Sequence, residues 1–179
     1  MTILTTILAV IALLIAAILI IAWLTKKEYA AEREIIINKP PQQVFDHIKF
    51  LRNQDNFTKW ATMDANMKKE YFGTDGTVGF ISAWDSDNKK VGKGEQEIKK
   101  ITEGKRLETE LRFIKPFTGL ANAYMTTEPY GNNATKVKWG FDSKMKYPMN
   151  ILLLFMNMDK MIGEDFATGL TNLKNVLEK

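Results

Sequence analysis

The sequence predicts an α+β fold: an antiparallel sheet wrapped around a long C-terminal helix, preceded by one transmembrane helix. Three observations support this prediction. No charged side chain precedes Lys26, strand-like segments with polar turns follow one another through the middle of the chain, and the last segment has one apolar stripe at helical spacing. The predicted parts are an anchor at 1–25, a linker at 26–33 and a single domain at 34–179.

The N-terminal segment from Ile7 to Leu24 is continuously apolar. As a helix it would be about 27 Å long, close to the ~30 Å hydrocarbon core of a bilayer. Trp23 stands where an interfacial aromatic residue is expected, and Lys26 ends the run. A cleaved signal peptide is the alternative, but the run is too long, no Lys or Arg precedes it, and no small-residue cleavage site follows. We therefore expect a retained membrane anchor.

The charges beside this segment predict its orientation. Lys26, Lys27 and Arg33 all lie on its C-terminal side. Because positively charged flanks remain on the cytoplasmic side, we expect a single-pass protein with its C-terminal domain in the cytoplasm.

The domain is expected to open with a strand and two short helices. The β-branched run 34–38 predicts the strand, and Pro40 and Pro41 end it. Apolar residues at helical spacing then predict one helix, and the polar run 53–56 is expected to cap a second helix that contains Trp60.

Six further strands are predicted. They cover residues 66–72, 77–84, 91–101, 106–113, 119–128 and 135–145. The fourth of these alternates clearly, with Leu107, Leu111 and Phe113 on one face and charged residues on the other. Strands of this kind, joined by short turns, predict one antiparallel sheet with a dry face and a wet face.

The closing helix is expected to begin near Pro148 or Met149. Its first part, Ile151–Met156, is apolar on every side, whereas the part after Lys160 has a single apolar stripe. We therefore predict that Ile151–Met156 is a gate or a membrane-facing lip. The competing explanation is that the loop at 116–119 folds over it.

The order of these elements is that of the helix-grip fold, and several segments resemble the SRPBCC (START-like) superfamily, which includes polyketide cyclase/dehydrase and lipid-transport proteins. The resembling segments are IIINKPPQQVF at 35–45, TDGTVG at 74–79, GKGEQEI at 92–98 and GLTNLK at 169–174. The resemblance implies a hollow space between the sheet and the last helix, and it does not imply one activity.

Nine side chains on the apolar faces of the strands and of the last helix are predicted to line that space. They are Trp84, Leu111, Phe113, Met125, Trp139, Phe141, Phe155, Met158 and Ile162. The predicted function is the binding or transfer of a hydrophobic small molecule such as a lipid, a quinone or a polyketide-like ring, without catalysis.

Two other functions stay open. One is a cyclase or dehydratase that uses Tyr124, Glu128, Arg112 or a neighbouring carboxylate as a general acid or base inside the pocket. The other is an interaction module that resembles chaperone activators and uses the surface of the sheet. We expect neither a cofactor nor a metal, because the chain has no cysteine and its single histidine is His47.

Binding to nucleic acid is not expected. The net charge is +4, from 25 basic and 21 acidic residues, and the two signs are interspersed without a basic stripe. The pairs of glutamates on single strand faces, such as Glu95 with Glu97, are best explained by cross-strand ion pairs.

Overall fold

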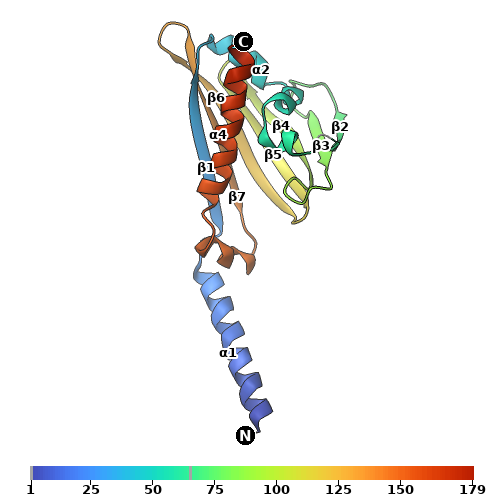
Figure 1. Ribbon diagram of the computed structural model, residues 1–179, viewed down its shortest axis with the longest axis vertical. Helices are drawn as coiled ribbons and strands as arrows, with labels where there is room; N and C mark the ends of the chain where they lie inside the picture. The colour runs from blue at the N-terminus through green and yellow to red at the C-terminus, as the bar shows by residue number, and fades with distance from the viewer. Residues whose placement is uncertain (1, 65) are drawn as a thin grey trace.

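The computed structural model describes residues 2–64 and 66–179; residue 1 of the predicted anchor lies outside these ranges. A seven-stranded sheet carries the helix α4 on one face, and the helix α1 projects from one end of the sheet, here called the base (Figure 1). The elements are α1 (Ile3–Leu24), β1 (Glu28–Ile37), α2 (Pro41–Ile48), the 3₁₀ helix η1 (Leu51–Asn56), α3 (Lys59–Met63), β2 (Lys68–Phe72), β3 (Ile81–Asp85), β4 (Lys93–Thr102), β5 (Arg106–Lys115), β6 (Gly119–Tyr130), β7 (Ala134–Lys144), the 3₁₀ helix η2 (Met149–Leu154) and α4 (Met158–Leu177).

The sheet has the strand order β1-β7-β6-β5-β4-β3-β2, and every neighbouring pair is antiparallel. The predicted helix-grip fold is therefore confirmed. One predicted strand, at 77–84, begins only at Ile81. Gly76 and Gly79 have φ angles of 76° and 88°, so the chain turns through left-handed conformations before the strand begins.

The first strand begins six residues before the predicted start, because β1 already pairs with β7 at Glu28. Most of the expected linker is therefore strand. Tyr29, Ala31 and Arg33 face α4, and the small Ala31 and the charged Arg33 hide the alternation in the sequence. Only residues 25–27 separate α1 from β1.

The closing helix also differs from its prediction, because it is divided in two. The 3₁₀ helix η2 comes first, and α4 begins only at Met158. Asn157 caps α4, since its side-chain oxygen accepts a hydrogen bond of 2.9 Å from the Lys160 backbone N–H. Because of this cap, α4 begins about nine residues later than the apolar run predicts.

The core lies between α4 and the sheet. Trp139 of β7 stacks on Phe166 of α4 with ring centroids 4.5 Å apart, and Trp60 of α3 meets both rings edge-on. Gly169 makes this approach possible, since a Cβ there would lie 2.7 Å from the Trp139 ring.

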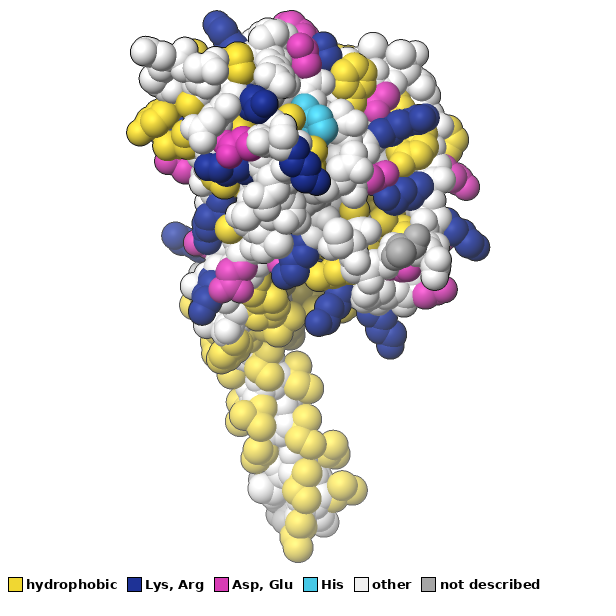
Figure 2. Space-filling model, turned by 45° about the horizontal axis from the view of Figure 1, so that its top comes forward, with side chains coloured by type: hydrophobic (Ala, Val, Ile, Leu, Met, Phe, Trp, Pro, Cys, Tyr) yellow, Lys and Arg dark blue, Asp and Glu magenta, His cyan; other side chains and the backbone are white. Residues whose placement is uncertain are grey.

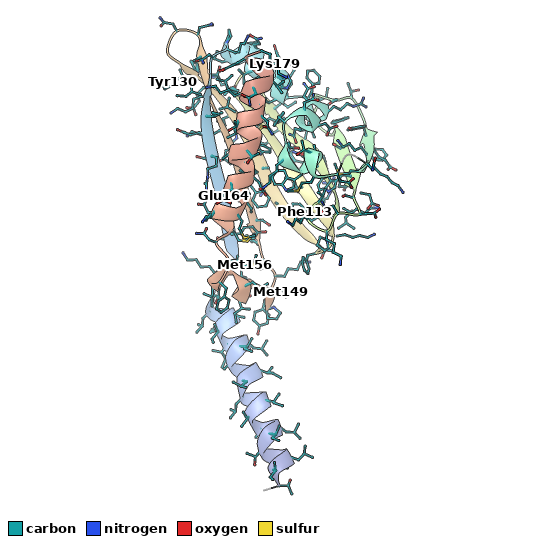
Figure 3. All side chains as sticks on the ribbon, viewed as in Figure 1. Phe113, Tyr130, Met149, Met156, Glu164 and Lys179 are labelled. Carbon is teal, nitrogen blue, oxygen red and sulfur yellow. The ribbon has the colours of Figure 1, made fainter. Side chains whose placement is uncertain are left out.

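The helix α1 is uninterrupted from Ile3 to Leu24, and Ala22 is its only buried residue. It is the one helix in residues 2–64 and 66–179 that is long and apolar enough to cross a membrane. Its side chains point outward on all sides (Figure 3).

Candidate functional site

The face of the sheet that carries α4 is here called the inner face. On β5 it presents Leu111 and Phe113, which lie opposite Ala121 and Gly119 of β6. Alanine and glycine are the two smallest residues, so Ala121 and Gly119 do not cover the neighbouring side chains. Leu111 and Phe113 are accordingly half-buried. The inner face therefore presents half-buried apolar side chains toward the base of the sheet.

The nine residues predicted to bind a ligand fall into three groups. Met125, Trp139 and Phe141 are buried in the core, and Phe155 is 82% exposed at the base of the domain. The other five are half-buried: Trp84, Leu111, Phe113, Met158 and Ile162.

Trp84 and Phe113 form the aromatic part of the open inner face. Their rings meet edge-on, with centroids 6.3 Å apart. Gly94 lies under the Trp84 ring, since a Cβ there would lie 2.6 Å from it, and the indole N–H donates to the Val91 carbonyl at 3.3 Å. These contacts hold the indole in one orientation on the inner face.

The space directly beneath α4 is filled by aromatic rings. Phe166 contacts both Trp139 and Phe141, at centroid distances of 4.5 and 6.4 Å. Two surface depressions have volumes of about 350 and 500 Å³. The smaller one includes Phe141, and the larger one is polar and contains none of the nine residues.

A buried asparagine joins the domain to α1. The Asn150 side-chain amide donates to the carbonyls of Ala22 at 2.6 Å and Thr25 at 3.0 Å. The two bonds satisfy carbonyls at the C-terminal end of α1, which lack partners within the helix. The sequence reasoning missed this residue, although a lone asparagine in the apolar run 149–156 is a visible signal.

The acid/base candidates of the enzymatic alternative do not face the core. Arg112, Tyr124 and Glu128 all lie on the opposite, outer face of the sheet, because their neighbours Leu111, Met125 and Thr127 point inward. They therefore do not face the space between the sheet and α4, and of the three only Tyr124 lines one of the two surface depressions described above.

Ion pairs and hydrogen bonds occupy these outer-face groups. Arg112 pairs with Glu95, Glu97 and Glu110 across β4 and β5, and its bonds lower the pKa of Glu97. The Tyr124 hydroxyl donates to Glu32, which together with burial raises the pKa of Tyr124 to about 12. The predicted cross-strand pairing of the glutamates is thus present.

His47 is half-buried in α2 near the Phe57 ring, and burial lowers its pKa. No group of three or more His, Cys, Asp or Glu side chains that could hold a metal occurs in the described ranges 2–64 and 66–179.

No family model matches the chain, and no curated protein matches it in sequence. Many solved structures match its fold. Truncated norcoclaurine synthase from Thalictrum flavum has a TM-score of 0.63 at 10% identity, over 86% of this chain and 95% of that one. XoxI from Bacillus cereus has a TM-score of 0.61 at 10% identity, over 84% and 96% of the two chains. Ara h 8.0201 has a TM-score of 0.55 at 12% identity, over 84% and 95%. The chain therefore shares the helix-grip fold of these proteins.

Proposed function

We propose that the protein is a membrane-anchored domain that binds or transfers a hydrophobic small molecule, with α1 as the anchor and without catalysis. The observation that carries this proposal is the close connection of two apolar features. A 22-residue apolar helix with exposed side chains runs through three residues into the sheet whose inner face holds half-buried aromatic side chains. A ligand that dissolves poorly in water would thus meet its binding face next to the bilayer.

The shared fold supports a small-molecule ligand. One solved structure with this fold is a norcoclaurine synthase point mutant in complex with a transition-state analogue, with a TM-score of 0.58. Of the nine predicted residues, we place the ligand on the accessible ones, with Trp84, Leu111 and Phe113 as the binding face and Phe155 near the entrance. Apolar side chains of this kind suit a lipid, a quinone or a polyketide-like ring.

The anchor is tested by extraction of membranes from cells that make the full chain. We expect the protein to stay with the membrane at alkaline pH and to leave it only in detergent. Release by alkali alone would contradict the anchor.

The binding face is tested by native mass spectrometry of the full chain released from detergent, with oleate as the probe ligand. A charge at Phe113 would oppose an apolar ligand, so Phe113→Glu should weaken oleate binding about tenfold or more. Ile114→Glu is the matched control, because Ile114 is the next residue on β5 and is 45% exposed on the other face. Equal loss in both variants, or no loss in Phe113→Glu, would contradict the proposed face.

A further inference from the structure

The base of the domain carries an exposed apolar surface around the point where α1 leaves it. Its members are Tyr147, Met149, Leu152, Leu154 and Phe155, here called the collar. They are 45%, 45%, 37%, 55% and 82% exposed. Figure 3 places Met149 and Met156 at the junction between the sheet and α1, and Figure 2 shows hydrophobic side chains continuing from α1 onto the domain.

The loop between β5 and β6 does not cover the collar with its own aromatic ring. Phe117, at the tip of this loop, is itself 72% exposed. The strand register brings the loop to the base, because the start of β6 pairs with the end of β7, which in turn pairs with the start of β1. A second apolar side chain therefore lies exposed at this end of the domain.

Hydrogen bonds fix the height of the collar along α1. The Tyr147 hydroxyl donates to the Leu19 carbonyl at 3.3 Å, and Asn150 bonds the carbonyls of Ala22 and Thr25. Leu19 lies five residues before Leu24, so this contact is about 7.5 Å before the end of the helix at 1.5 Å per residue. The Tyr147 end of the collar therefore reaches the last apolar turns of α1, and the buried Asn150 lies at the end of the helix.

Charged residues lie just beyond this level. Lys26, Lys27 and Lys146 are exposed where the chain enters and leaves the base of the sheet. An apolar band followed by lysines and an exposed aromatic ring is the pattern of a surface that crosses from hydrocarbon into the phosphate layer.

From these contacts we infer that the collar lies in the interfacial layer of a phospholipid bilayer, with Phe155 and Leu154 among the upper acyl chains and the lysines at the phosphate groups. The inference rests on the proposed function, because it requires α1 to span the membrane. It adds that the domain sits directly on the bilayer instead of moving on a flexible tether. It also places the start of α4, and with it Met158 of the proposed binding face, next to the lipid surface.

The test uses the absence of cysteine from the chain, which allows one nitroxide label per variant. Phe155→Cys reports on the collar, Leu13→Cys on the middle of α1, and Tyr130→Cys on an exposed aromatic residue at the opposite end of the sheet (Figure 3). The full chain is placed in bilayers of phosphatidylcholine and phosphatidylglycerol. Collisions with oxygen, which concentrates in lipid, are compared with collisions with a water-soluble nickel chelate.

The expected result is oxygen-rich collisions at positions 13 and 155 and nickel-rich collisions at position 130. A nickel-rich label at 155 beside an oxygen-rich label at 13 would overturn the collar inference and leave the anchor intact. A label at 155 shielded from both reagents would also overturn it, because the collar would then be covered by protein. A nickel-rich label at 13 would instead refute the proposed anchor, and the inference with it.

Discussion

At the scale of single residues, two buried or half-buried polar side chains connect parts of the chain that are far apart in sequence. Asn150 bonds the end of α1, and Arg33 of β1 bonds both the side chain and the backbone carbonyl of Asp159 in α4. Asn150 in addition replaces water around backbone carbonyls that would otherwise lose hydrogen bonds when covered. Both contacts can be tested by substitution.

Asn150→Ala should loosen η2 from α1. The side chain is fully buried and donates two hydrogen bonds, so its loss should cost about 1–3 kcal/mol locally. We expect hydrogen exchange of the η2 amides to accelerate by roughly 5- to 150-fold, measured by mass spectrometry on the full chain. Asn132→Ala, in the exposed turn before β7, should leave exchange in η2 unchanged.

Gly163→Ala should destabilise the domain, although alanine favours a helix by about 1 kcal/mol over glycine. A Cβ at Gly163 would lie 2.1 Å from the Arg33 guanidinium and would displace it from Asp159. Chemical denaturation of the full chain measures the effect. In an Arg33→Ala background the same substitution should become neutral or stabilising, and continued destabilisation there would contradict this explanation.

Tyr124 should ionise at unusually high pH. Its bond to Glu32 and its burial stabilise the neutral phenol and raise its pKa to about 12, above the ordinary value of 10. The stabilisation is therefore complete below pH 10 and is lost as pH rises from about 10 to 12. Carbon-13 NMR of labelled tyrosine should follow this titration. Glu32→Gln should lower the pKa of Tyr124 toward 10, and an unchanged value would show that Glu32 is not the cause.

At the scale of elements, alternation and capping explain most of what could be predicted. The middle strands were found because apolar and charged residues alternate along them, as on β5. The early part of β1 is not visible in the sequence, because the inward-facing Ala31 and Arg33 do not form an apolar alternation. The predicted start of α4 is too early, because the apolar run ends at Asn157, which caps the helix. The partner of β1 is β7, which is distant in sequence, so local patterns do not report this pairing.

Phe166 is the residue of α4 whose loss should weaken the domain most clearly. It is 2% exposed and stacks on Trp139, so Phe166→Ala should cost about 3–5 kcal/mol of unfolding free energy. Met161→Ala is the control on the same helix, because Met161 is 50% exposed and should contribute about 0.5 kcal/mol or less. Urea denaturation followed by tryptophan fluorescence compares the two.

At the scale of the whole molecule, the sequence predicted the anchor-like helix, the sheet and the apolar inner face, but not how they are joined. The prediction of the nine site residues rests on the alternation along the strands and the helical spacing alone. The alternation along β7 correctly predicts that Trp139 and Phe141 point inward. It does not show that Phe166 of α4 packs on both rings and fills the space beneath the helix. Nor could it show that Phe155 leaves the inner face, because that depends on the break between η2 and α4.

The orientation across the membrane is also testable. Lys26 and Lys27 predict a cytoplasmic domain. A Tyr130→Cys variant in intact cells should therefore react with a membrane-impermeant thiol reagent only after the membrane is permeabilised. Labelling without permeabilisation would place the domain on the outer side.

The short connection between α1 and β1 has a consequence within the plane of the membrane. Three residues and the Asn150 bonds leave the helix little freedom to rotate about its axis without turning the sheet with it. A membrane protein that packs against one side of α1 would therefore always meet the same side of the domain. The rotational orientation of α1 about its own axis would then determine which neighbouring membrane protein the binding face is turned toward.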